Sequence, residues 1–141
     1  MPSFTILEPK ERPSLTKKHT HQYFIEGEFP TLNQYISAER SSKFRAADLK
    51  KVFTQVTQYS VEGEDPVDLR FPCCASFVWY RANLMTDLDN ISFGQKFVLD
   101  GLVNAGIIPD DNLKHIIEIR HKVVLRPDNT GVEITFSETT G

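Results

Sequence analysis

The sequence predicts a single small α+β domain with a mixed β-sheet and two main helices, in the order strand, helix, strand, helix, strand, strand. The chain has 141 residues, which suits one domain with a hydrophobic core. Hydrophobic residues make up 40% and charged residues 25%, as in ordinary globular proteins. Stretches with the period of strands and of helices follow one another without a repeat. We expect an N-terminal arm at residues 1–20, the domain at 21–138 and a tail at 139–141.

The first half of the domain predicts a strand, a loop and a helix. Residues 21–26 are rich in aromatic and β-branched side chains, which favours a strand. Pro30 disfavours helix at the residue before it, so residues 29–36 are predicted as a loop. From Ser42 to Tyr59 apolar residues recur at helical spacing, which predicts a helix. Its apolar stripe contains Leu49, Val52, Phe53, Val56 and Tyr59.

The middle of the chain predicts a buried strand and a second helix. After an acidic connector, residues 71–82 form a nearly continuous apolar run, typical of a strand buried on both faces. A helix is predicted from about Asn90 to Ala105, with Asp89 or Asn90 as its N-cap and Gly106 after its end. On this helix Lys96 and Asp100 are four positions apart and are expected to form an ion pair.

The C-terminal part predicts two further strands. Apolar and charged residues alternate from 117 to 123, which predicts a half-buried strand. Residues 126–131 form a turn, and a second alternation from 132 to 137 predicts the other arm of a hairpin.

Composition excludes several classes of protein. No run of about 18 apolar residues exists, so we expect no membrane span. The N-terminus has no basic segment followed by an apolar core, so we expect no secretory signal. Cys73 and Cys74 are adjacent, which disfavours a disulfide and suits a reducing compartment such as the cytoplasm. The net charge of −3 disfavours nucleic-acid binding unless the acidic residues surround a cation.

Two groups of basic residues have both a structural and a functional interpretation. Lys17, Lys18, His19 and His21 are either a solvated tail or a contact with DNA phosphates. A second group lies before and along the first predicted helix, where it forms either a solvated face or a DNA contact. This group comprises Arg40, Lys43, Arg45, Lys50 and Lys51.

The acidic residues Asp87, Asp89 and Asp111 are candidates for a metal site. Each alone is explained by helix capping or turn formation. In an extended segment, however, Asp87 and Asp89 would face one side while Leu88 packed inward. Such close like charges repel unless one carboxylate is protonated or a cation lies between them. Carboxylate oxygens suit Mg²⁺ or Mn²⁺, and no Cys/His pattern for zinc is present. The sequence leaves the distance from Asp111 to the other two open.

The same region resembles the RusA-type Holliday junction resolvases, especially their phage and prophage branch. The similarity covers the segments Asp87-Leu88-Asp89-Asn90, 95–102 and 105–111, with a weaker match at residues 30–36. The resemblance implies a RusA-like fold and a homodimeric, Mg²⁺-dependent endonuclease that resolves four-way DNA junctions by symmetric nicks in recombination and repair.

The resemblance also implies the roles of individual residues. The three essential carboxylates of the family fall on Asp87, Asp89 and Asp111, and its essential lysine falls on Lys96. The sequence differs from the shorter bacterial members by about three extra residues between Asn90 and Gln95. In an α-helix three residues rotate the chain by about 300°, so the orientation of Lys96 is open.

Two other functions are consistent with the sequence. One is a non-catalytic DNA-binding or architectural dimer, in which the acidic residues only cap and turn the chain. The other is a metal-dependent phosphohydrolase that acts on a nucleotide or on another nucleic acid. The absence of a glycine-rich phosphate loop disfavours a nucleotide substrate.

Overall fold

The structure is a computed structural model that describes residues 20–139, and it confirms the α+β class and the mixed sheet. The four strands have the spatial order β1-β4-β2-β3. They are β1 (Thr20–Glu26), β2 (Cys73–Arg81), β3 (Ile116–Leu125) and β4 (Gly131–Glu138). The helices are α2 (Leu32–Ser41), α3 (Lys43–Ser60), α4 (Leu88–Ile91) and α5 (Gln95–Asn104), with a 3₁₀ turn η1 (Ser92–Gly94). The predicted arm lies, except for Thr20, outside the described residues, as do residues 140 and 141 of the tail.

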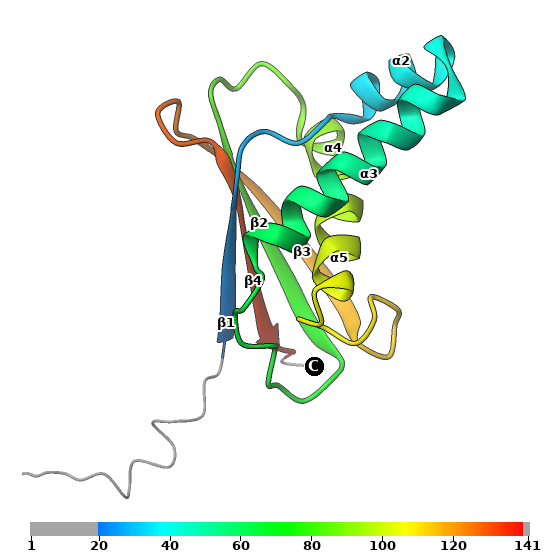
Figure 1. Cartoon of the computed structure of the whole chain (residues 1–141). Coiled ribbons are helices and arrows are strands. Elements are labelled where there is room, and N and C mark those ends of the chain that lie inside the picture. Colours follow the sequence, from blue (N-terminus) through cyan, green and yellow to red (C-terminus); the bar gives the residue numbers. More distant parts are fainter. Residues whose placement is uncertain (1–19, 140–141) are drawn as a thin grey trace, which may run out of the picture.

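The core lies between the sheet and the helices α3 and α5, which cover one of its faces (Figure 1). From the central strand β2, Ala75, Phe77 and Trp79 point into this core and are almost fully buried. On the opposite face Cys74 is buried, but Ser76, Val78 and Tyr80 are only half-buried, so the strand is not buried on both faces as predicted. None of the helices in residues 20–139 is long and apolar enough to cross a membrane.

Helix α2 replaces most of the loop that was predicted for residues 29–36. Thr31 is its N-cap and forms a capping box with Gln34, in which each side chain bonds the other residue's backbone N–H. Thr31 with Gln34 three positions later is a helix-start pattern. Pro30 therefore precedes the helix and does not prevent it.

The predicted C-terminal hairpin is wrong. Strand β4 pairs with β1 and β2, both antiparallel, whereas β3 pairs in parallel with β2. The connection between β3 and β4 therefore passes the end of β2, where the Arg126 N–H donates to the Arg81 carbonyl. This places β4 inside the sheet and leaves β3 at its edge.

The apolar patterns of β3 and α3 are only partly buried. Ile117 and Ile119 are 52% and 40% exposed, because within residues 20–139 no strand pairs with the outer side of β3. In α3, Val52 and Tyr59 are exposed, whereas Phe53 and Val56 pack against the core as predicted.

Candidate functional site

The first two candidate ligands, Asp87 and Asp89, lie at the start of α4 and not in an extended segment. Asp87 is the N-cap, and Asp89 is in the helix. Leu88 is 44% exposed, so the prediction that it packs inward is wrong. Helical residues two positions apart do not face each other, so strand alternation does not bring these carboxylates together. Both side chains are exposed, and that of Asp87 makes no capping hydrogen bond.

Asn90 joins the acidic motif to the start of α2. Its Oδ1 accepts a hydrogen bond of 2.9 Å from the Asn33 backbone N–H. The expected cap by Asp89 or Asn90 is therefore not formed, since Asp87 holds the N-cap position and Asn90 bonds a different helix. This bond brings the two segments that carry the family resemblance into contact.

The extra residues before Lys96 form the 3₁₀ turn η1. A 3₁₀ helix has three residues per turn, so three added residues return the chain to about the same orientation. They advance it by about 6 Å along the axis. An ideal turn of this kind would keep the direction of Lys96 relative to Asp89 and move it further along the helix axis.

Lys96 contacts two carboxylates from different parts of the chain. Its Nζ lies 3.3 Å from Asp100 Oδ1 and 3.7 Å from Asp111 Oδ2. The bond to Asp100 is the predicted pair within the helix, whereas Asp111 comes from the loop before β3. The structure therefore brings together Lys96 and Asp111, two of the four candidate catalytic residues.

Asp110 and Asp111 are adjacent in the loop before β3, but their carboxylates have different contacts. Asp110 accepts hydrogen bonds from the Asp111 backbone N–H at 2.7 Å and from the Asn112 side chain at 3.2 Å. It therefore stabilises the loop itself. The Asp111 carboxylate is turned toward Lys96 instead, which distinguishes it as the functional candidate of the pair.

The charge of Lys96 is stabilised by this arrangement. Partial burial lowers its pKa, but hydrogen bonding and charge from Asp100 and then from Asp111 outweigh burial. The net effect is a raised pKa, so Lys96 stays protonated at neutral pH. An ammonium group has three donors, so it can contact two carboxylates and one further oxygen.

The expected three-carboxylate metal site is not assembled. Within residues 20–139, no group of three or more His, Cys, Asp or Glu side chains is placed to hold a metal ion. Asp89 lies in α4 and precedes Lys96 by seven residues, with the 3₁₀ turn η1 between them, whereas Asp111 contacts Lys96. Mg²⁺, however, is often held by one or two carboxylates with water and phosphate. The exposed carboxylates of Asp87 and Asp89 fit that requirement by their chemistry.

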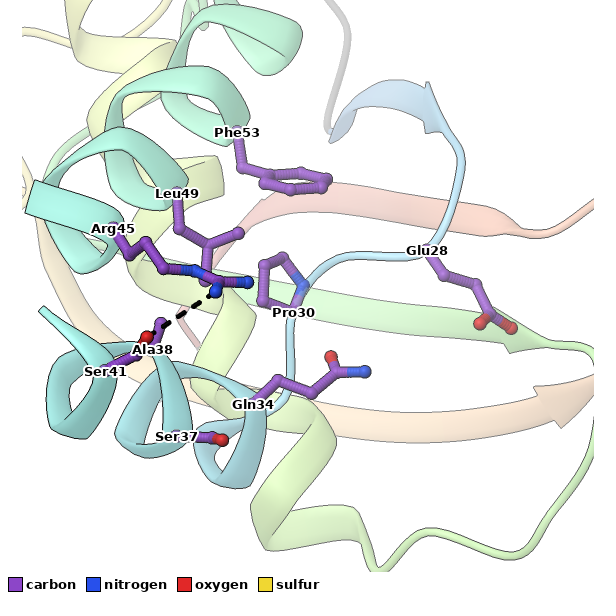
Figure 2. Close-up of a pocket in the computed structure, with 9 residues that line it drawn as sticks. All are labelled: Glu28, Pro30, Gln34, Ser37, Ala38, Ser41, Arg45, Leu49 and Phe53. Carbon is purple, nitrogen blue, oxygen red and sulfur yellow. Dashed lines mark hydrogen bonds between the residues drawn. The ribbon is translucent and has the colours of Figure 1, made fainter.

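Three of the five basic candidates border one of two hollows, and the other two lie at the junction of α2 and α3. Arg45 borders a cavity of about 580 Å³ between α2, α3 and the segment after β1, where Figure 2 shows it opposite Glu28. Lys50 and Lys51 border a groove of about 470 Å³ between α3 and α5, which also contains Asp100. Arg40 and Lys43 lie at the exposed junction of α2 and α3.

Of these two hollows, the groove between α3 and α5 is the one that reaches the Lys96 cluster, through Asp100. Lys17, Lys18 and His19 lie outside the described residues, and His21 in β1 accepts a hydrogen bond from the Asp68 backbone N–H.

Trp79, His121 and Gln95 form a hydrogen-bond chain that the sequence did not indicate. The Trp79 indole N–H donates to His121 Nδ1 at 3.0 Å, so the neutral ring carries its proton on Nε2. That atom lies 3.2 Å from Gln95 Oε1. These hydrogen bonds hold Gln95, which is the first residue of α5 and the neighbour of Lys96, against β3. No local pattern predicts it, because the three residues come from three elements.

No known protein-family model matches the chain, and a search of curated proteins finds no similar sequence. The RusA resemblance therefore rests on the motif residues, and the function has to be argued from the site.

Proposed function

We propose that this chain is a RusA-type, Mg²⁺-dependent endonuclease that nicks four-way DNA junctions as a homodimer in the cytoplasm, during recombination and repair. The observation that supports it most is the contact between Lys96 and Asp111. The family resemblance singles out both residues, and they lie in different elements. A turn that served only to connect α5 to β3 would not require this pairing.

In this proposal Asp87 and Asp89 would hold Mg²⁺, with Mn²⁺ as an alternative, and Asp111 would hold Lys96 in position. The bound ion would lower the pKa of water and neutralise charge on the scissile phosphate. Lys96 would donate its remaining N–H to a phosphate or leaving-group oxygen as negative charge develops. Asp100 and Asp111 keep it charged and restrict its position.

The basic residues would position DNA through its phosphates. Lys50 and Lys51 would hold a backbone that passes along the groove toward Lys96. Arg40, Lys43 and Arg45 would contact a more distant arm of the junction, because they lie on the projecting α2–α3 end (Figure 1).

Nicking of a synthetic four-way junction in Mg²⁺ tests the proposal. We expect Lys96→Gln to lower the rate by about 10²–10³-fold, since it removes a donor to developing charge. Asp89→Asn and Asp111→Asn should also abolish most activity. Asp110→Asn is the matched control: it changes the adjacent carboxylate, whose contacts lie within the loop, and should keep the wild-type rate.

A specific observation favours the main alternative, a DNA-binding dimer without catalysis. The charge of Lys96 is already balanced by two carboxylates, as in a purely structural ion pair. Binding of the junction without nicking by the wild type would support this alternative, and equal nicking by wild type and Asp89→Asn would exclude the catalytic assignment. Inhibition by nucleoside triphosphates together with their hydrolysis would indicate a phosphohydrolase instead.

A further inference from the structure

The two edges of the sheet have different surfaces. Strand β1 forms one edge, and its apolar residues Tyr23 and Ile25 are buried. Strand β3 forms the other edge and is ten residues long, without proline. It exposes Ile117, Ile119 and Leu125, which are 52%, 40% and 52% accessible. A long edge strand with exposed apolar side chains is a template for pairing with another strand.

The geometry of a twofold dimer restricts how β3 can pair with a second copy. Two identical strands related by a twofold axis perpendicular to the sheet must run antiparallel. The helices of both copies then cover the same face. Ile119 pairs with Ala75 of β2 and therefore lies on the helix-covered face, whereas Glu118 and Arg120 lie on the opposite face.

Charge selects one register among these arrangements. With Ile119 opposite Ile119 of the second copy, each Glu118 lies opposite an Arg120. Within one chain, the Arg120 guanidinium already lies 2.9 Å from Glu118 Oε2. The two copies would therefore form a square of four charges with alternating sign. Centring the pair on Glu118 or on Arg120 instead places like charges opposite each other, which is unfavourable.

The edge is also continuous with the candidate site. The loop that carries Asp111 leads directly into β3, and His121 of β3 binds Gln95 beside Lys96. Pairing through β3 would therefore fix the two candidate sites of a dimer relative to each other. The first residues of the two β3 strands would lie roughly 20 Å apart along the strand direction.

We propose that two copies of this chain pair through β3, antiparallel and centred on Ile119, so that their four-stranded sheets become continuous. The inference rests on the proposed function, because it assigns an interface to the homodimer that was proposed there. Its test measures assembly of the full chain without DNA or metal, so loss of nicking and loss of pairing are distinguishable.

Exchange of the two charges tests the pairing by sedimentation or light scattering. Glu118→Arg and Arg120→Glu should each weaken dimerisation by about tenfold or more, because each places like charges across the interface. The double variant E118R/R120E restores the alternation and should return the dissociation constant to the wild-type range. A folding defect would not be rescued in this way.

Cysteine cross-linking tests the register. Ile119→Cys should form a disulfide between copies on oxidation, because directly opposite Cβ atoms lie about 4.5–5.5 Å apart. The native Cys73 and Cys74 are buried. Ile117→Cys is the matched control: it is more exposed, but it would lie opposite His121 and should remain uncross-linked.

Several outcomes would overturn the proposal. These are a monomeric wild type at about 100 µM, charge variants that dimerise like wild type, or cross-linking through Ile117→Cys but not Ile119→Cys. Phe44, next to the first residue of α3, is 82% exposed. Figure 1 shows that this end of α3 projects away from the sheet. Dissociation by Phe44→Lys, with intact β3 variants, would place the interface on the α2–α3 end instead.

Discussion

At the scale of single residues, the burial of His121 links stability to pH. Burial lowers the pKa of this imidazole below its ordinary value of 6.5. Between the lowered pKa and 6.5 the unfolded chain binds more protons than the folded chain. The contribution of His121 to the free energy of unfolding is therefore present above 6.5 and is lost as the pH falls through the folded pKa.

The variant His121→Gln tests this link because it cannot titrate. Wild type should lose more stability than the variant between about pH 7.5 and pH 5.5, measured by urea unfolding. The difference in the free energy of unfolding between the two proteins at each pH removes the contribution of the other titrating groups, which both proteins share. A pH dependence that is the same in both proteins would contradict the lowered pKa of His121.

At the same scale, the sequence predicted which residue types form the candidate site better than it predicted how those residues are arranged. The pairing of Lys96 with Asp100 followed from their spacing on a helix and is confirmed. The contact of Lys96 with Asp111 required the path of the loop after α5, which the sequence did not define. The expectation that Asp87 and Asp89 face one side was wrong because the helix begins at Leu88, earlier than its apolar pattern indicated.

At the scale of elements, close packing of α3 against α5 depends on Gly101. A Cβ added there would lie 2.5 Å from Thr57 Cβ and 2.7 Å from the Thr54 carbonyl oxygen. Thr57 is fully buried and cannot move away freely. Alanine would favour the helix by up to about 1 kcal/mol, but the backbone contact requires the helices to separate.

We therefore expect Gly101→Ala to lower the free energy of unfolding by about 1–3 kcal/mol, as in other overpacked cores. Urea denaturation measures the change. Asn104→Ala, at an exposed position of the same helix, should remain within about 0.5 kcal/mol of wild type. A Gly101→Ala variant as stable as wild type would show that α3 and α5 separate without cost.

Elements were predictable where burial produced a local pattern. The end of α5 is an example: Gly106 has φ +77°, and the Ile107 N–H donates to the Leu102 carbonyl, as expected for a helix that ends at glycine. Helix α2 buries none of its residues, so it had no strong apolar stripe, and only its capping box indicated it. The position of β4 between β1 and β2 depends on pairing between distant segments, which no local pattern contains.

At the scale of the whole molecule, the net charge of −3 requires any DNA contact to be local. The groove between α3 and α5 supplies one such place, since Lys50 and Lys51 lie in it and Asp100 connects it to Lys96. Each phosphate that a lysine neutralises contributes about 0.9 to the slope of log affinity against log salt. The slope for junction binding therefore reports how many of these lysines contact DNA.

Replacing both lysines by glutamine should make this slope shallower by about 2, measured by fluorescence anisotropy of a labelled junction in EDTA between about 50 and 200 mM salt. Arg70→Gln is the charge-matched control, because Arg70 lies in the connector before β2 and outside the groove lining. If Arg70→Gln changes the salt slope as much as the replacement of one of the two lysines does, the change would reflect the overall charge of the protein and not a contact in the groove. An unchanged slope in the double variant would place the DNA away from the groove, because two neutralised phosphates cannot be lost without a change in counterion release.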